Sequence, residues 1–400
     1  MAFINVVAKF FVTLMLTLVS CELQVWNQFG ADARNSRCAP YTSGPHHGAE
    51  LKWSFDTAGS IWSSSACVGS DGSVYIGSSD GYMYSLSGST GQLQWSFPTH
   101  GNVTSSPAFS HSLELVIFGS EDAVLYALDA ATGNLRWTLH ADAALTSSLA
   151  LCENSKWVVV SSNSGQIYSV DAATGAVYWQ HAASTNPAPG GVSSSPAFNA
   201  KTNSVVIGTT SGQVLSLDAL TGKLVWTFQA GDGIASSPTI DSNGDVFIGS
   251  WDFYVYKLCG INGTALWRFK TGSIVQSSPA LSLNSSVVYV GSLDYNVYAL
   301  NAATGTPRWI YSTGGYVGSS AAVDAVGTVF IGSDDKYLYA LDGVTGSLLW
   351  RYAAGKEVYS SPALSMNGSL VFGSNDGIVY CLSESGVGSN LDASTNVDTI

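Results

Sequence analysis

The feature that most constrains this chain is a unit of about 42 residues that recurs eight times. Each unit begins with a Ser-Ser pair, and the pairs start at Ser63, Ser105, Ser147, Ser194, Ser236, Ser277, Ser319 and Ser360. A second series, with the same period, consists of Trp53, Trp95, Trp137, Trp179, Trp226, Trp267, Trp309 and Trp350. A period of this length indicates a repeat architecture, in which each unit is one supersecondary structure packed on its neighbours.

Within a unit, the alternation of apolar and polar residues predicts four short β-strands. In the unit from residue 277 they read SSPALSL, SVVYVGS, YNVYALN and TPRWIYS. Asp-x-x-Thr-Gly or a close variant separates the third strand from the fourth, and Asp and Gly are residues that close tight turns. A four-stranded unit of this size is typical of a propeller blade.

The two series are out of step, because the first Trp has no Ser-Ser pair before it and the last pair has no Trp after it. Residues 360–382 supply three strands of the last blade, and ELKWSF (50–55) supplies a fourth. Pairing these ends would close a ring and remove free sheet edges. We therefore predict an all-β fold over 51–382, an eight-bladed β-propeller of four-stranded antiparallel blades. The alternative is seven blades and a stray strand.

The two ends of the chain differ from the repeats. An apolar run at 10–20 follows Lys9, which is typical of a signal peptide over 1–21, although an uncleaved anchor is the alternative. Residues 18–21 also fit a bacterial lipobox, in which Cys21 would carry the lipid. We expect an extracytoplasmic protein that is secreted, periplasmic or lipid-anchored. Residues 22–50 are predicted to be a lead-in segment, and residues 383–400 a disordered tail.

The composition argues against several functions. The net charge is −13, and the 15 Lys and Arg residues are scattered, so no basic stripe exists to bind nucleic acid or an anionic membrane. The cysteines never form CxxC, which argues against zinc, redox and covalent haem sites. His100, His140 and His181 follow their blade tryptophans at unequal offsets, which argues against one shared metal site.

The repeated motif resembles that of a known family. A-L-D-A-x-T-G-x-x-x-W, with SSPA and V-x-x-G-S-x-D before it, resembles the repeat of pyrroloquinoline-quinone-like (PQQ-like) propellers. WNQFGADARNSRCAPYTSGP (26–45) is similar to the lead-in segment of such proteins. The resemblance implies an eight-bladed, often exported fold. The family includes quinoprotein dehydrogenases and non-catalytic scaffolds such as the lipoprotein of the bacterial outer-membrane assembly machine, so fold alone does not settle function.

The resemblance also implies what a dehydrogenase of this family should contain. Its quinone usually lies under a disulfide between adjacent cysteines, with Ca²⁺ held by acidic and Asn side chains and an Asp as base. This sequence has no adjacent Cys pair and no long insertion between blades. We therefore assign no catalytic, cofactor-binding or metal-binding residue. PQQ with Ca²⁺ remains an alternative.

Positions that differ between the repeats are candidates for function, because positions alike in every copy serve the scaffold. In a meander, the loops that join the fourth strand to the next unit, and the second strand to the third, lie on one face. On that face, several large side chains replace the small or polar residues of other copies. They form a candidate binding face of Trp62, Trp251, Phe253, Leu293, Tyr295, Tyr316 and Lys336. The alternative is that these side chains fill gaps between blades.

The leading hypothesis is an exported, monomeric and non-catalytic scaffold that binds a partner protein or an extracellular ligand through this face, since Trp and Tyr are common binding anchors. A PQQ-dependent dehydrogenase of alcohols or sugars is one alternative, and a glycan-binding propeller is another. The eight repeated tryptophans are predicted to be structural, each packed between neighbouring blades.

Overall fold

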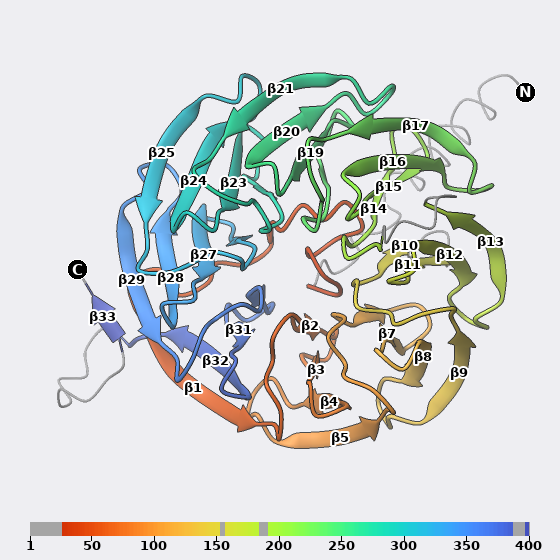
Figure 1. The fold of residues 1–400 in the computed structure, drawn as a ribbon. Helices are drawn as coiled ribbons and strands as arrows, with labels where there is room; N and C mark the ends of the chain where they lie inside the picture. The colour runs from red at the N-terminus through yellow and green to blue at the C-terminus, as the bar shows by residue number, and fades with distance from the viewer. Residues whose placement is uncertain (1–25, 153–156, 184–190, 387–396, 400) are drawn as a thin grey trace, which may run out of the picture.

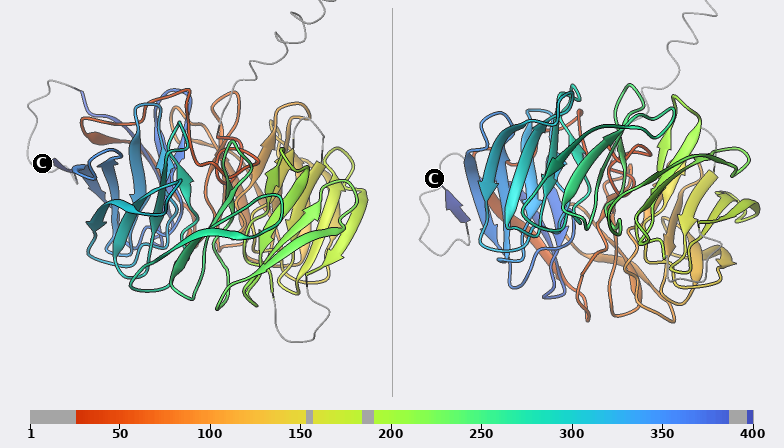
Figure 2. Two further views of the ribbon diagram at one scale, coloured as in Figure 1. Left: turned by 90° about the horizontal axis from the view of Figure 1, so that it is seen from above. Right: turned by 45° about the horizontal axis from the view of Figure 1, so that its top comes forward.

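The computed structural model describes residues 26–152, 157–183, 191–386 and 397–399. Its strands form eight antiparallel sheets arranged around a central axis, so the predicted eight-bladed propeller is confirmed (Figure 1). Viewed edge-on, the ring is a flat disc (Figure 2). The predicted signal peptide and lipobox lie outside the described residues. Within the described ranges, no helix is long and apolar enough to cross a membrane.

Each blade has four strands, called A to D from the axis outward, joined as a meander (Figure 1). The strands of blades one to four are, in that order, β2 (Cys67–Val68), β3 (Val74–Gly77), β4 (Tyr82–Leu86), β5 (Leu93–Pro98); β6 (Ala108–Ser110), β7 (Leu115–Gly119), β8 (Val124–Asp129), β9 (Leu135–His140); β10 (Ala150–Cys152), β11 (Trp157–Ser161), β12 (Gln166–Asp171), β13 (Val177–Ala182); β14 (Ala197–Asn199), β15 (Ser204–Gly208), β16 (Gln213–Asp218) and β17 (Leu224–Gln229).

The strands of blades five to seven are β18 (Thr239–Ile240), β19 (Val246–Gly249), β20 (Tyr254–Leu258), β21 (Ala265–Lys270); β22 (Ala280–Leu281), β23 (Val287–Gly291), β24 (Asn296–Asn301), β25 (Pro307–Ser312); β26 (Ala322–Val323), β27 (Thr328–Gly332), β28 (Tyr337–Asp342) and β29 (Leu348–Ala353). Blade eight contains β30 (Ala363–Leu364), β31 (Leu370–Gly373), β32 (Ile378–Glu384) and, from the other end of the chain, β1 (Ala49–Asp56).

The core lies between the blades. In blade six every residue of β23 is buried and so are the four central residues of β24, whereas β25 alternates between exposed and half-buried positions. Strands B and C carry apolar side chains on both faces because a neighbouring blade covers each face. Strand D faces solvent on its outer edge, which explains the return of polar residues there.

The repeated tryptophans link each blade to the next. The indole Nε1–H donates to a carbonyl oxygen in the C–D turn of the following blade at 2.8–3.1 Å in seven pairs: Trp53 to Gly88, Trp95 to Ala130, Trp137 to Ala172, Trp179 to Ala219, Trp226 to Gly260, Trp267 to Ala302 and Trp309 to Gly343. Trp350 donates instead to Pro45 of the lead-in segment at 2.9 Å. Seven of the eight indoles therefore form a joint between two blades, and Trp350 joins its blade to the lead-in segment.

The turn glycine supplies the other half of this joint. Gly305 in the turn between β24 and β25 has φ +71°, a conformation that favours glycine. A Cβ at this position would lie 2.7 Å from Cδ2 of Trp267 in the preceding blade. The Thr-Gly turn and the tryptophan thus recur together because they contact one another across the blade interface.

The ring closes as the out-of-step repeats predict. β1 pairs antiparallel with β32 from Ala49↔Glu384 to Asp56↔Ile378, and the two lie side by side in Figure 1. The Glu384 carboxylate accepts the backbone N–H groups of His46 and His47 at 2.6 and 2.9 Å. The strands extend slightly beyond 51–382, and β33 (Val397–Thr399), in the segment predicted to be a disordered tail, pairs with β29. Residues 387–396 and 400 lie outside the described residues.

The lead-in segment caps the inner edges of seven blades. Its oxygen atoms accept hydrogen bonds from strand A amides at 2.6–3.0 Å: from Val68 to Trp26, Phe109 to Asn27, Leu151 to Gln28, Phe198 to Ala33, Ile240 to Arg34, Leu281 to Ser36 and Val323 to Arg37. These amides would otherwise lie unpaired at the sheet edges around the axis. The segment is therefore part of the propeller, and its Phe29 lines the axial channel.

The Ser-Ser pairs form a hydrogen-bonded ring around the axis. The backbone N–H of the second serine of each pair donates to the hydroxyl of its counterpart in the next blade at 2.9–3.1 Å, through Ser65, Ser106, Ser148, Ser195, Ser237, Ser278, Ser320, Ser361 and back to Ser65. The pair in blade one is therefore Ser64-Ser65. The prediction that this pair starts at Ser63 is therefore wrong by one residue, because residues 63–65 are all serine.

Candidate functional site

The B–C loops are held rigidly by one aspartate in six of the blades. Its Oδ1 accepts the N–H two residues later, and its Oδ2 accepts a tyrosine hydroxyl at 2.6–2.8 Å, as in Asp294 with Tyr298. Oδ2 also accepts a backbone N–H from the preceding D–A loop. Burial and this carboxylate raise the pKa of Tyr298. The aspartates at these positions therefore fix the loops of this face.

The residue that follows the aspartate position adopts a left-handed backbone in all eight blades, including the two that have serine in place of the aspartate. Four blades place glycine there: Gly81, Gly165, Gly212 and Gly377, with φ +83 to +97°. Blade two has Ala123, and blades five to seven have Phe253, Tyr295 and Lys336 at φ +77, +74 and +77°. A non-glycine residue in this region is disfavoured by about 1 kcal/mol or more, and bulky side chains are uncommon there. Three consecutive blades therefore present large side chains from strained positions.

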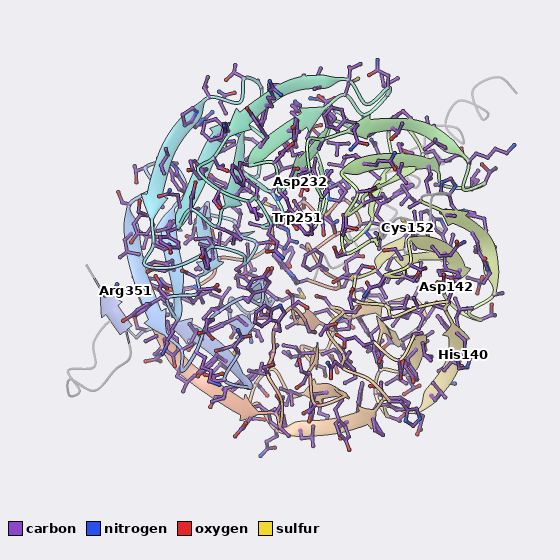
Figure 3. The ribbon with its side chains drawn as sticks, in the orientation of Figure 1. His140, Asp142, Cys152, Asp232, Trp251 and Arg351 are labelled. Carbon is purple, nitrogen blue, oxygen red and sulfur yellow. The ribbon has the colours of Figure 1, made fainter. Side chains whose placement is uncertain are left out.

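The predicted face residues divide into two groups. Trp62, Tyr316, Tyr295 and Phe253 have 53, 47, 45 and 37% of their surface exposed. Lys336 is exposed as well, whereas Trp251 and Leu293 are half-buried. Figure 3 places Trp251 near the centre of the ring, far from His140 at its outer edge.

Two aromatic pairs stand on this face. The rings of Tyr295 and Tyr316 lie 5.2 Å apart, which joins the B–C loop of blade six to the D–A loop that follows it. Trp62 stacks on Tyr359 with ring centroids 5.1 Å apart. Sequence reasoning missed Tyr359 because it precedes the Ser-Ser pair of blade eight and lies outside the column of B–C loops. A comparison of the residues just before each pair would have identified it.

Trp62 and Tyr359 line a cavity of about 260 Å³ at the mouth of the axial channel. Trp251, Gln276, the second serines of six pairs and Phe29 of the lead-in segment also line it. The Arg37 guanidinium carbon lies 4.0 Å from the Phe29 ring centroid, and this side chain is fully buried. Among the described residues its three side-chain nitrogens have no hydrogen-bond partner, and burial lowers the Arg37 pKa to about 9.

The pKa of one carboxyl group on this face is strongly raised. Burial, and then the neighbouring carboxylates of Glu357 and Asp335, raise the pKa of Asp334 to about 6. The backbone N–H of Asp334 donates to the carbonyl of Tyr316 at 2.9 Å. Asp334 therefore adjoins the loop that presents Tyr316.

The cavity does not fit the quinone cofactor that the fold implies. Pyrroloquinoline quinone carries three carboxylates, which need cationic or multiple N–H partners when they leave water. No charged side chain lines this cavity within the described part of the chain, and Arg37 is covered by Phe29. The described residues also contain no group of three or more His, Cys, Asp or Glu side chains arranged for a metal ion.

Comparisons with known proteins agree with the architecture. BamB from Moraxella catarrhalis superposes with a TM-score of 0.69 at 21% identity, covering 84% of this chain and 99% of that one. Quinohemoprotein alcohol dehydrogenase from Comamonas testosteroni gives a TM-score of 0.75 at 15% identity and covers 92 and 83%. The computationally designed Ika8 protein gives 0.70 at 21% identity and covers 83 and 99%. Likeness at these identities establishes the fold alone.

Sequence comparison is more specific. No curated protein matches the chain. One family profile, described as outer membrane protein assembly factor BamB, matches residues 43–199 and 294–395, which is more than half of the chain. Fold, repeat motif and profile agree, and the chain belongs to this PQQ-like propeller family of outer membrane protein assembly factor BamB.

Proposed function

We propose that this protein is an exported, non-catalytic scaffold that binds a partner protein through the loops of blades five to seven. The binding surface, called the aromatic rim below, consists of Phe253, Tyr295, Tyr316, Leu293 and Lys336. Membership of the BamB family supports a scaffold role. The absence of a fitting quinone site in the described channel supports the same conclusion.

The observation that carries the proposal is the backbone conformation at Phe253, Tyr295 and Lys336. Four other blades have glycine at this turn position, so the fold does not require a large side chain there. A residue held in a disfavoured conformation lowers the stability of the fold. Such residues are concentrated at functional sites, where the function compensates for the lost stability. The left-handed conformation lowers the folding stability by about 1 kcal/mol at each of these positions, which lie in three neighbouring blades.

The exposure of these side chains is consistent with recognition. Tyr295 and Tyr316 are nearly half exposed while their rings contact one another, so each ring is held in place and still presents a face to solvent. Rigid aromatic side chains lose little conformational entropy on binding and are common interface anchors. The Asp294 bonds fix the loop beneath them.

Binding can be tested by replacing the rim residues with glycine, the residue that sister blades use. The double variant Phe253→Gly and Tyr295→Gly removes both aromatic side chains and relieves the backbone strain. We expect this variant to be at least as stable as the parent and to lose partner binding at least tenfold. The matched control is Ile261→Ala, which truncates an exposed apolar residue in a C–D turn on the opposite face. Retained binding by the double variant would contradict the proposal.

A further inference from the structure

We propose that the axial cavity behind the aromatic rim binds a neutral polyhydroxylated ring, such as one saccharide residue. The proposal concerns the cavity and is independent of the partner-binding surface. It is based on four features of the cavity, which are the lack of charged lining side chains, the hydroxyl donors and acceptors, the aromatic rings and the volume.

The cavity wall is polar but uncharged. Its polar side chains are hydroxyls and one amide, Gln276, and no Asp, Glu, Lys, Arg or His side chain of the described residues lines it. A charged ligand group needs an opposite charge or several strong hydrogen bonds when it leaves water, whereas a neutral polar group needs only hydrogen-bond partners. The wall therefore favours a neutral ligand with many polar groups.

The deeper hydroxyls offer donors. The lining includes Ser148, Ser195, Ser237, Ser278, Ser320 and Ser361 of the serine ring, and each is at least nine-tenths buried. Each hydroxyl oxygen accepts an N–H from the preceding blade. Among the described residues we find no acceptor for their protons. A hydroxyl can donate as well as accept, so these six O–H groups can donate to the oxygen atoms of a ligand in the cavity.

The hydroxyls nearer the mouth offer acceptors. Blades two and three place Thr104 and Thr146 just before their serine pairs, and both line the cavity. Their hydroxyl protons are already used, because Thr104 donates to Glu121 at 3.1 Å and Thr146 donates to Asn163 at 2.6 Å. The threonine oxygens keep a free lone pair. A sugar hydroxyl both donates and accepts, so it matches a wall that contains both kinds of partner.

Aromatic rings from other blades complete the lining. Trp251 packs over Gly233, where a Cβ would lie 2.4 Å from its ring, and Tyr359 packs in the same way over Gly318. Trp62 stacks on Tyr359 and remains half exposed. The two glycines let both rings lie against the wall. A lining that combines aromatic rings with hydroxyls suits a pyranose, which carries C–H groups on its faces and hydroxyls at its edge.

The size of the cavity limits the ligand. Sites for drug-sized molecules are typically about 300–1,000 Å³, and this cavity is slightly smaller at about 260 Å³. It therefore suits a single ring, either free or as the terminal residue of a longer glycan that leaves through the mouth.

The test is a titration of the purified full chain with neutral and charged sugars, followed by saturation-transfer NMR and calorimetry. The neutral probes are glucose, galactose, mannose and N-acetylglucosamine, and the charged probes are glucuronate and inorganic phosphate. We expect at least one neutral sugar to bind with a Kd of about 1 mM or tighter, a range that weak single-site ligands reach, and glucuronate to bind at least tenfold more weakly.

Variants then locate the binding. Trp62→Ala removes a half-exposed ring and Ser237→Ala removes one hydroxyl, and each should weaken sugar binding about fivefold or more. Tyr178→Ala, which truncates an exposed ring on the outer strand β13, is the matched control and should leave the affinity unchanged. No neutral sugar binding up to 50 mM, roughly fifty times the expected Kd, would overturn the proposal in favour of a water-filled channel. Tighter binding of glucuronate or phosphate would overturn it in favour of an anion site above Arg37.

Discussion

The joint between blades predicts a specific difference between two glycine substitutions. Gly305 and Gly327 both have a left-handed backbone, with φ +71 and +89°. A Cβ at Gly327 would meet no atom within 4 Å, whereas a Cβ at Gly305 would lie 2.7 Å from Cδ2 of Trp267. Alanine at either position therefore introduces backbone strain, but only alanine at Gly305 also displaces the indole.

The magnitudes follow from these two terms. Alanine in the left-handed region costs about 1 kcal/mol relative to glycine. A carbon contact of 2.7 Å must open by about 1 Å, and such overpacking costs roughly 1–3 kcal/mol, part of it from lost burial of Trp267. We therefore expect Gly327→Ala to lower the free energy of unfolding by about 1 kcal/mol and Gly305→Ala by about 3 kcal/mol.

Equilibrium unfolding in urea, monitored by far-UV circular dichroism, would measure both values. The slope of each transition should match that of the parent, so that the shift in midpoint reports stability. Equal destabilisation by the two substitutions would refute the idea that the turn glycine is required by the tryptophan of the preceding blade.

Three further predictions use other parts of the structure. Trp309→Ala should cost about 3–5 kcal/mol in the same assay, with Trp309→Phe costing clearly less because only the hydrogen bond and part of the ring are lost; an unchanged unfolding midpoint for the alanine variant would contradict the joint. Glu384→Gln should lower stability by about 1 kcal/mol, since the amide retains one acceptor oxygen for the two amides of the lead-in segment, and no loss would argue against a role in closure. Asp334→Asn should stabilise the protein by about 1 kcal/mol at pH 8 but should not stabilise it at pH 3.5. This value is discounted for solvent screening, because the carboxyl group is only half-buried. The sign follows because the raised pKa of about 6 makes the folded state hold a proton that the unfolded state has released, so stability falls as pH rises from about 4 through 6; an equal effect at both pH values would exclude titration of this carboxyl.

The repeats made the ring predictable. Strand order, blade number and closure by β1 all followed from the offset between the serine and tryptophan series, because each unit is short and its contacts are with adjacent copies. The register of blade one did not follow, since Ser63, Ser64 and Ser65 are equivalent as letters. Only the hydrogen bonds to Gly77 and Ser361 distinguish them.

The irregular segment was not predictable in the same way. Residues 26–45 have no periodicity, yet they contact strand A of seven blades, and Phe29, with Arg37 against its ring, lines the axial cavity. Long-range contacts of a segment without regular structure leave no pattern in sequence. The strained positions did leave one, because Phe253 and Tyr295 stand in the same column as Gly81 and Gly165.

The aromatic rim is tested most directly by site-specific photo-crosslinking in the cells that export the protein. A benzoylphenylalanine would replace Tyr295 or Tyr316 on the rim, and Val344 or Ile261, exposed in C–D turns, on the opposite face. We predict that both rim positions crosslink to the same discrete protein and that the two control positions do not. Crosslinks from Val344 and Ile261 alone, or from all four positions alike, would contradict the assignment of partner binding to blades five to seven.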